Sequence, residues 1–259
     1  MAENTPALVK RAIHGNQVVV FTLNDPDRRN ALSADMRVQF LEALRREATN
    51  PESRAVVLTG AGSAFCAGGD ISAMGIDPDR SIERLKILHE ATRLLAGFPK
   101  PVVAAVNGHA FGAGWSLALL ADYAITAPQA KFGATFGKMG LVPDTAFLWA
   151  AARRVGQTRS LQLFMSARTV AAEEALSSGL VDEMSENVLE DAIARAESFC
   201  GVAPLAFAAA KATYAEGPEG IEPYLKREFE DQSRMYRSKD HLEAVAAFRE
   251  KRSPQFNGS

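Results

Sequence analysis

Short apolar runs alternate with amphipathic stretches along most of the chain. Residues Val18–Leu23, 56–59 and Val102–Val106 are short, largely β-branched runs that end at turn residues, a pattern typical of buried strands. Between these runs, apolar residues recur at helical spacing over 36–44 and 82–95. Strands that alternate with amphipathic helices predict an α/β fold.

The pattern changes near residue 187. Before that point, further strands are predicted at Tyr123–Thr126 and 180–184, with a helix over 169–179 between them. Beyond it the strand pattern stops and only helices are predicted, at 189–199, at 224–236, and from a cap at Ser238 to a point before Pro254.

These patterns divide the chain into two regions. We expect an α/β core over residues 1–194, which binds the ligand, and a helical C-terminal region over 195–259. No linker rich in Gly, Ser or Pro separates them, so the helices are expected to pack on the core or on a neighbouring subunit. Within the core, an apolar strand, a glycine-rich turn and a helix recur, at 58–69 and again at 106–114. The polar stretch 73–84 predicts a mobile loop or an irregular helix.

Composition narrows the class of protein. The chain has 259 residues, of which 47% are hydrophobic and 23% charged, enough for a substantial core. Its net charge of −2, without a long basic block, argues against nucleic acid as a partner, and no apolar run is long enough to span a membrane. Two cysteines, Cys66 and Cys200, and no secretory signal indicate the cytoplasm. No cluster has metal-ligand spacing, so no metal is expected.

Two glycine-rich stretches carry the candidate chemistry. Residues 65–70 and 107–114 each close an apolar run, and the second leads directly into a predicted helix. Glycine and alanine let main-chain N–H groups approach a ligand, and a helix start adds free donors and the positive end of a dipole. Two such turns that face one pocket predict an oxyanion hole, which binds an oxygen as it becomes negative.

Seven short motifs occur in a fixed order, at 29–33, 58–62, 65–70, 105–108, 140–144, 175–181 and 248–256. Together they resemble the enoyl-CoA hydratase/isomerase (crotonase) superfamily over nearly the whole chain. The resemblance implies a spiral of repeated ββα units and a C-terminal helical region used in assembly of a homotrimer or a dimer of trimers. It also implies an acyl-coenzyme A thioester as substrate. Coenzyme A would then enter as part of the substrate, with no permanently bound cofactor.

The resemblance assigns roles by position. The main-chain N–H groups of Gly69 and Ala113 are implied as the oxyanion donors. The main chain of Ala67 matches the position that binds the adenine of coenzyme A. The remaining implied coenzyme A contacts are a basic pair near the phosphates, two neighbouring motif positions and a lysine that reaches across a subunit interface: Arg28, Arg29, Ala31, Asp70 and Lys251. For the three cations the alternative is a solvated surface.

The departures from the family pattern bear on the reaction. Hydratases of this family use two glutamates to hold water, and here Ser116 and Phe136 stand at those positions. One acid, Asp144, matches the position used by a subset of isomerases, and the surrounding residues resemble the isomerases of aerobic phenylacetate breakdown, which act on a ring-epoxide thioester. Those enzymes continue with a small residue and two glycines, whereas this chain continues with Thr145 and Ala146.

One carboxylate is enough for an isomerase, because it can take a proton from one carbon and return it to another. The ordinary pKa of an aspartate is near 4, and nearby aromatic side chains are expected to desolvate Asp144 and raise it. These are Phe132, Phe136, Phe147 and Trp149. The simpler alternative is that Asp144 caps the following helix. Two further residues, His109 and Cys66, are expected to be structural.

The sequence thus favours an enzyme that isomerises a coenzyme A thioester through an enolate. Two alternatives stay open: a hydratase or thioester hydrolase that uses another acid, and a non-catalytic protein that binds acyl-coenzyme A.

Overall fold

The computed structural model describes residues 7–15, 17–75, 77–216 and 220–256. Its larger sheet has six strands in the order β1-β2-β3-β5-β7-β10. They are β1 (Val9–His14), β2 (Val18–Leu23), β3 (Ala55–Gly60), β5 (Val102–Val106), β7 (Tyr123–Thr126) and β10 (Glu183–Met184). Only β1 and β2 pair antiparallel within it. The smaller sheet has the order β4-β6-β8-β9: β4 (Ala64–Cys66), β6 (His109–Phe111), β8 (Lys131–Gly133) and β9 (Thr169–Ala171).

The two sheets are built by a repeat. In three successive pairs, β3 with β4, β5 with β6 and β7 with β8, the first strand enters the larger sheet and the second enters the smaller one. The second pair leads directly into helix α3 (Ala113–Leu120). This arrangement is the expected spiral of ββα units, so the α/β fold class is confirmed. The glycine-rich turns follow β4 and β6, which are parallel neighbours.

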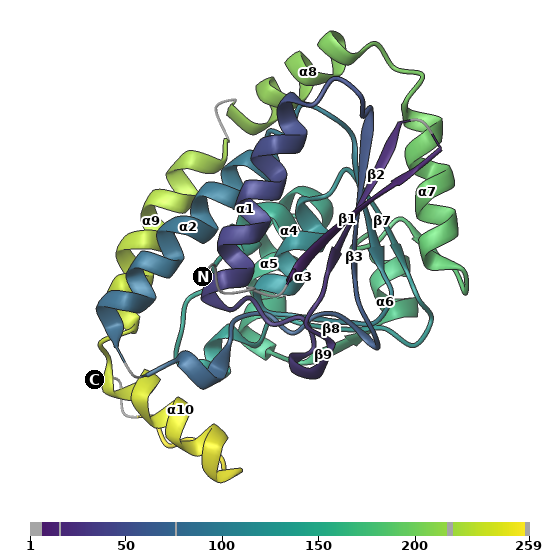
Figure 1. The fold of residues 1–259 in the computed structure, drawn as a ribbon. Coiled ribbons are helices and arrows are strands. Elements are labelled where there is room, and N and C mark those ends of the chain that lie inside the picture. The colour runs from purple at the N-terminus through teal and green to yellow at the C-terminus, as the bar shows by residue number, and fades with distance from the viewer. Residues whose placement is uncertain (1–6, 16, 76, 217–219, 257–259) are drawn as a thin grey trace, which may run out of the picture.

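Helices enclose the sheets (Figure 1). In chain order they are α1 (Ala34–Thr49), α2 (Pro78–Ala96), α3, α4 (Phe147–Val155), α5 (Gln157–Ser166), α6 (Ala172–Ser177), α7 (Val188–Phe199), α8 (Pro204–Glu216), α9 (Ile221–Met235) and α10 (Lys239–Glu250), with short 3-10 turns η1 (Pro26–Arg28), η2 (Ile71–Ala73) and η3 (Thr135–Met139).

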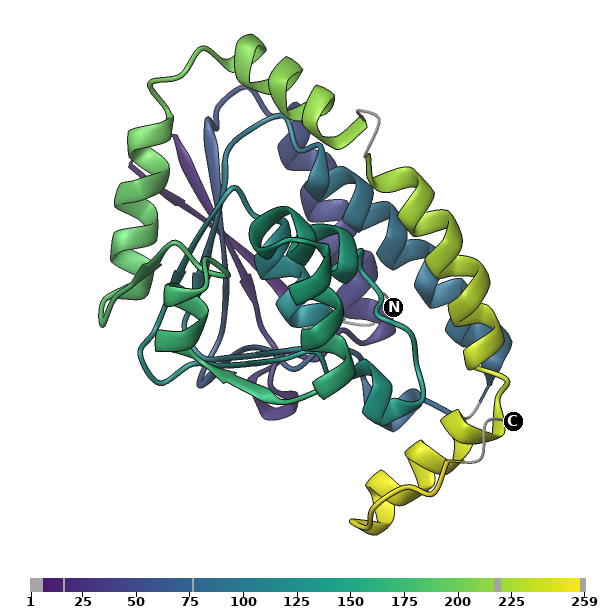
Figure 2. The ribbon, with the colours of Figure 1, turned by 180° about the vertical axis from the view of Figure 1, so that it is seen from behind.

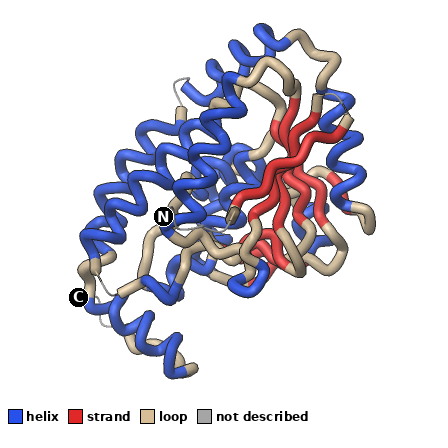
Figure 3. Tube along the Cα trace, in the orientation of Figure 1, coloured by secondary structure: helices blue, strands red, loops and turns tan. Residues whose placement is uncertain are grey.

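The helices lie on opposite sides of the larger sheet. Helix α7 packs against β2, β3, β5 and β7, while α1, α2 and α9 form a layer on the other side, also visible from behind in Figure 2. Figure 3 shows the same division, with helices concentrated on one side of the strands. The expected boundary between residues 194 and 195 falls inside α7. No single helix in the described ranges is long and apolar enough to cross a membrane, and α7 with α8 passes that test only as a pair bent by 107°.

Most predicted elements are present, with three corrections. The second half of stretch 73–84 is regular helix, because Asp77 caps α2 by accepting the N–H groups of Asp79 (3.0 Å) and Arg80 (3.1 Å). The helix predicted over 169–179 begins instead as strand β9, which pairs with β8, and becomes α6 afterwards. The strand predicted over 180–184 is limited to β10.

Some elements give little sequence signal. Strands β4, β6 and β8 have three residues each, too few for a recognisable alternation. Strand β1 is mostly exposed, so it lacks an apolar run. Helix α8 also lacks a regular apolar face, since only Lys211 and Ala215 are buried along it.

Candidate active site

The two glycine-rich turns are in direct contact. A Cβ atom built on Gly68, whose φ is +88°, would lie 2.6 Å from the carbonyl oxygen of Phe111 and 3.4 Å from the nitrogen of Ala113. A Cβ atom on Gly114 would lie 2.3 Å from the carbonyl oxygen of Cys66. Only glycine permits this approach at both positions. The contact brings the turn that contains Gly69 against the start of α3.

Both expected oxyanion donors are available. Helix α3 begins at Ala113, after Gly112 with φ +52° and ψ −127°, so the N–H of Ala113 lies in the first turn, where no earlier helical carbonyl can accept it. On the other turn, Leu32 donates its N–H to the carbonyl of Gly68 (2.8 Å) and leaves the next N–H, that of Gly69, uninvolved. Within the described ranges neither Gly69 nor Ala113 donates its N–H to another residue. Two free amides on touching turns can bind a carbonyl oxygen that gains negative charge.

Asp144 lies between η3 and α4 and is buried, with 8% of its surface exposed. Burial raises the pKa of Asp144 to about 6, the nearby Glu228 carboxylate acts in the same direction, and Arg37 opposes both. Thr145 donates its hydroxyl to Asp144 Oδ1 (3.1 Å). The alternative role as a helix cap does not apply, because the residue before α4 is Ala146 and no side chain caps that helix. A buried carboxylate with a pKa near neutrality suits general acid–base chemistry.

The two positions that carry glutamate in hydratases have other roles here. Ser116 is fully buried in α3 and donates its hydroxyl to the main-chain carbonyl of Asp144 (3.1 Å). Phe136 packs against Phe147, with ring centroids 5.7 Å apart, and lies 3.6 Å from where a Cβ on Gly112 would stand. Neither side chain supplies a carboxylate to activate water.

The four aromatic residues expected near Asp144 fall into two separate groups in the structure. Phe147 also packs against Trp115, which in turn contacts Phe132, so these rings form one buried group with Phe136. Trp149 instead lies against Tyr214 and beneath the Arg153 guanidinium.

Arg37 is a charged residue near the site that the sequence analysis did not predict. Arg37 in α1 is 7% exposed; its Nε donates to the carbonyl of Leu32 (2.8 Å), and its Nη2 lies 3.8 Å from where a Cβ on Gly69 would stand. Its positive charge lowers the pKa of Asp144. The signal was present in the helical spacing, because Arg37 falls on the same face as Phe40, Leu41 and Leu44.

Helix α9 contributes a second missed group. Its buried face presents Glu228 and Gln232 among apolar residues at helical spacing, and Tyr236 follows one turn later. Glu228 contacts the turn after Asp144 and also His89 of α2. Burial lowers the pKa of His89 to about 4, so this histidine is neutral. A polar stripe on an otherwise buried helical face was the available clue.

The residues expected to contact coenzyme A are mostly brought together. Arg28 pairs with Asp25 (2.8 Å) and approaches Asp70 (3.6 Å), with half of its side chain exposed. Ala67 donates its N–H to the carbonyl of Arg29 (2.9 Å), and Ala31 donates to that of Arg28 (3.1 Å). Lys251 follows α10 and is exposed, and no described contact connects it with the other five residues. The five lie beside the turn that contains Gly69.

Cys66 and His109, the two residues expected to be structural, lie in the smaller sheet. Burial raises the pKa of the Cys66 thiol to about 12, which keeps it protonated and unreactive. His109 pairs with Ala64 in the smaller sheet, and its ring packs against Phe111 with centroids 6.1 Å apart.

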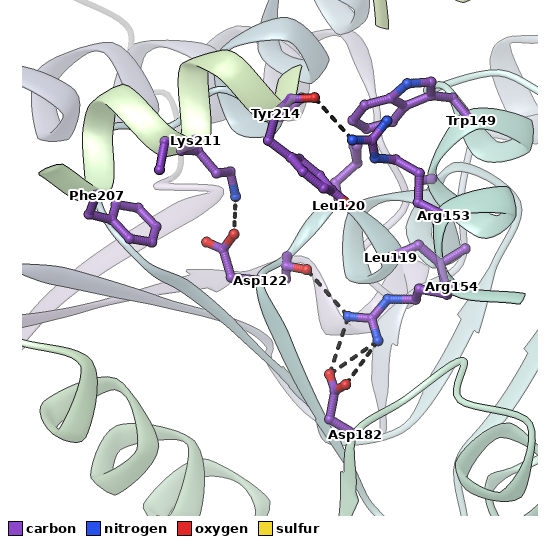
Figure 4. Close-up of a pocket in the computed structure, with 14 residues that line it drawn as sticks. Leu119, Leu120, Asp122, Trp149, Arg153, Arg154, Asp182, Phe207, Lys211 and Tyr214 are labelled. Atoms are coloured by element: carbon purple, nitrogen blue, oxygen red, sulfur yellow. Dashed lines mark hydrogen bonds and ion pairs between the residues drawn. The ribbon is translucent and has the colours of Figure 1, made fainter. Parts of the chain in front are cut away.

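A separate cavity of about 390 Å³ lies between α3, α4 and α8 (Figure 4). Two of its cations form ion pairs within the protein: Lys211 binds Asp122, and Arg154 binds both oxygens of Asp182 (3.1 to 3.2 Å). Arg153 stacks over Tyr214, 3.6 Å from the ring centroid. Since Asp122 directly precedes β7, the cavity lies at the amino end of that parallel strand, away from the turns that follow β4 and β6. We interpret this region as the contact that attaches α8 to the core.

Comparison with known proteins gives the family and the fold of the chain. The model of the family described as enoyl-CoA hydratase/isomerase matches residues 14–259. The chain is 35% identical to the 1,2-epoxyphenylacetyl-CoA isomerase of Escherichia coli K12, over 93% of this chain and 95% of the relative. It is 39% identical to a probable enoyl-CoA hydratase of Rhodobacter capsulatus, over 93% and 95%. A crystal structure of an enoyl-CoA hydratase/isomerase from Mycobacterium paratuberculosis superposes with a TM-score of 0.87 at 25% identity, over 94% of this chain and 99% of that one. The chain therefore belongs to the enoyl-CoA hydratase/isomerase family and has the crotonase fold.

Proposed function

We propose that this chain isomerises a coenzyme A thioester through an enolate, with Asp144 as the proton carrier. The observation that carries the proposal is the position of one buried carboxylate. Asp144 is connected through the Ser116 hydroxyl to α3, the helix whose first residue is the oxyanion donor Ala113. The absence of glutamate at 116 and 136 supports isomerisation over hydration.

In the proposed reaction the thioester carbonyl oxygen accepts hydrogen bonds from the N–H groups of Gly69 and Ala113. Asp144 takes a proton from the α-carbon, and the C–H electron pair moves toward the carbonyl to give an enolate. For a 3-enoyl thioester this enolate extends over the double bond, and Asp144 returns the proton at the γ-carbon. The double bond moves and no atom is gained or lost. Each N–H donor is expected to lower the barrier by about 3 kcal/mol.

The substrate is recognised in the proposal by its coenzyme A portion, which is not retained between turnovers. Arg28 and Arg29 face the phosphates, and the main chain of Ala67 faces the adenine. A homotrimer or dimer of trimers is part of the same proposal. Large apolar side chains left exposed on the helices support an assembly of this kind: Leu161, Met165, Leu205 and Phe248. Light scattering of the purified protein measures its mass in solution.

The reaction is tested with a 3-enoyl-coenzyme A and with phenylacetyl-coenzyme A in D₂O. The first reports movement of the double bond, and the second reports enolate formation as deuterium gained at the α-carbon. We expect both activities in the wild type and a loss of about 1,000-fold or more in Asp144→Asn, because Asp144 is the acid to which the proposal assigns the proton transfer. Full activity in Asp144→Asn ends the proposal.

Hydration of a 2-enoyl-coenzyme A is the second candidate, because relatives such as the Rhodobacter capsulatus protein are named probable hydratases. The two reactions differ in product mass, since hydration adds one water and isomerisation adds nothing. Tight acyl-coenzyme A binding without turnover, unchanged by Asp144→Asn, would instead identify a non-catalytic binding protein.

A further inference from the structure

The buried face of α9 holds the loop that contains Asp144. Glu228 Oε1 accepts the N–H of Thr145 (2.8 Å), and Oε2 accepts the N–H of Ala146 (2.9 Å). One turn further along α9, Gln232 Oε1 accepts the N–H of Val142 (3.1 Å). Three main-chain donors around Asp144 are therefore bound by side chains from a helix more than 80 residues later in the chain.

The turn after Asp144 is one that the chain adopts only under constraint. Thr145 has φ +57° and Ala146 has φ +54°, the left-handed region that favours glycine. The β-branched side chain of Thr145 makes this conformation still less favourable. Both residues are buried, so their N–H groups would lack partners if Glu228 were absent. The two oxygens of one side chain accept two successive N–H groups, and this supplies the constraint.

His89 fixes the carboxylate from the opposite side. Its Nε2 lies 2.6 Å from Glu228 Oε1, and both side chains are almost fully buried. The ring of His89 packs edge-on against Phe229 of α9, with centroids 6.1 Å apart. Helix α2 therefore sets the orientation of Glu228, and Glu228 sets that of the turn.

We propose that Glu228, oriented by His89, is a positioning residue that holds the Thr145–Ala146 turn in its left-handed form and so aims the Asp144 carboxylate at the substrate. This inference rests on the proposed function of Asp144. It makes the C-terminal helical region part of the proton-transfer site, beyond its expected use in assembly. Glu228 itself touches neither the substrate nor the reacting atoms in this proposal.

The test replaces Glu228 with glutamine, which keeps the shape but offers one acceptor oxygen and places an NH₂ group against the second N–H. We expect kcat for isomerisation of a 3-enoyl-coenzyme A to fall about 10- to 100-fold with KM changed less than threefold, because a small displacement of the reacting group affects the chemical step. Glycine at 146 permits the left-handed conformation without the hydrogen bonds from Glu228, and Thr145 is kept because its hydroxyl donates to Asp144 Oδ1. The double variant Glu228→Gln, Ala146→Gly is therefore expected to recover about threefold or more of that loss.

The matched control is Glu47→Gln, which neutralises a glutamate that is also buried but lies near the C-terminal end of α1, where it binds Arg11, Asn50 and Ser53. It is expected to leave kcat within twofold. If Glu228→Gln does not accumulate as folded protein, His89→Phe removes the orienting partner alone and is expected to lower kcat three- to tenfold.

Three results overturn the inference: wild-type kcat in folded Glu228→Gln, a loss that glycine at 146 does not recover, or, where His89→Phe is the variant tested, an unchanged kcat. These differ from failure of the proposed function, which is reported by Asp144→Asn. If Asp144→Asn is inactive while Glu228→Gln is fully active, Asp144 remains the proton carrier and only the positioning role is lost.

Discussion

The hydroxyl of Ser116 donates to the main-chain carbonyl of Asp144 across 3.1 Å. A position that holds a catalytic glutamate in family hydratases thus serves here to attach the Asp144 loop to α3. The same hydroxyl lies 3.4 Å from the carbonyl of Gly112. The contact is to the main chain, so we expect Ser116 to orient the loop and not to carry the proton.

Ser116→Ala is therefore expected to lower the free energy of unfolding by about 1 kcal/mol, the usual contribution of one buried hydrogen bond. We expect kcat to fall less than tenfold, with its pH dependence unchanged. The matched control is Ser160→Ala, which removes another buried hydroxyl that donates to a main-chain carbonyl, that of Leu148 (3.1 Å). Denaturant unfolding and kcat of both variants check this. A loss above 100-fold in Ser116→Ala alone would assign the serine a part in proton transfer.

Ala113→Pro deletes one of the two proposed oxyanion donors and is expected to leave helix α3 intact. Ala113 is the first residue of α3, where proline is well tolerated because its missing N–H has no helical partner. Gly112, the residue before it, has φ +52° and ψ −127°. These angles mirror the extended conformation that residues adopt before proline, and glycine can adopt both forms. Gly112 is therefore expected to accommodate a proline at position 113. We expect kcat/KM to fall about 100- to 1,000-fold.

The control is Lys239→Pro, which places proline at the first position of α10, away from the glycine-rich turns. It is expected to leave kcat/KM unchanged. Equal activity in Ala113→Pro and the wild type would remove Ala113 from the oxyanion hole. Circular dichroism of both variants shows whether the helices are retained.

Arg37→Met tests the charge that faces Asp144. Burial raises the pKa of Asp144 to about 6, and Arg37 opposes that rise. A base must be ionised, so activity is expected to increase as pH rises through the pKa of Asp144 and to level off above it. Removing the cation raises this pKa further, and the midpoint of the pH–rate profile is expected to move to higher pH. The loss of activity is therefore largest in acid.

Arg45→Met provides the comparison, because Arg45 lies on the same helix with half of its side chain exposed and pairs with Glu90. Its profile is expected to coincide with that of the wild type. A midpoint that stays in place or moves to lower pH in Arg37→Met contradicts the assignment of the profile to Asp144.

The local parts of the site could be predicted from the sequence, and the distant parts could not. Gly69 and Ala113 lie in continuous glycine-rich motifs, so the chain itself indicates two turns with free N–H groups. Asp144 was found by its motif position. Glu228 binds Thr145 and Ala146 across 82 or 83 residues of sequence, and no local pattern specifies which helix packs there.

The same distinction holds for the fold. Buried strands such as Val102–Val106 have a strong apolar pattern, whereas the strands β4 and β6 that present the glycine turns have only three residues each. Their existence depends on pairing with each other, which is a tertiary contact. The left-handed turn at Thr145 was unpredictable for a related reason, because neither threonine nor alanine favours it and the stabilising carboxylate comes from α9.

Asp144→Asn is expected to stabilise the protein while it abolishes activity. The pKa of Asp144 is raised from 3.8 to about 6 in the folded chain, so between these values the unfolded state has lost a proton that the folded state retains. Wild-type stability therefore falls as pH rises through this window, by a total of about 3 kcal/mol at most. Asparagine does not titrate, so the variant is expected to gain stability relative to the wild type above pH 6 and to lose that advantage near pH 4.

Urea unfolding of both proteins across this pH range measures the difference in their free energies of unfolding. Asp122→Asn serves as the contrast, because Asp122 is the ion-pair partner of buried Lys211 and its neutralisation leaves that cation unpaired. It is expected to destabilise the protein at neutral pH. A stability gap between Asp144→Asn and the wild type that is constant with pH would show that the aspartate is not desolvated.

Ala146→Gly tests the strain in the turn directly. Ala146 has φ +54°, a conformation that costs an L-residue about 1 to 2 kcal/mol and glycine almost nothing. The greater freedom of glycine in the unfolded chain offsets about half of that gain. We expect a net increase of about 0.5 to 1 kcal/mol in the free energy of unfolding, with kcat retained because Glu228 still binds the N–H of residue 146.

The matched change Ala152→Gly lies within α4, in ordinary helical conformation, and is expected to destabilise the protein by about 1 kcal/mol. The same denaturant titration measures the change in the free energy of unfolding for both substitutions. An increase for Ala146→Gly and a decrease for Ala152→Gly identify the turn as strained. Equal decreases would mean that the left-handed conformation at residue 146 is not strained, so that Glu228 is not needed to stabilise it.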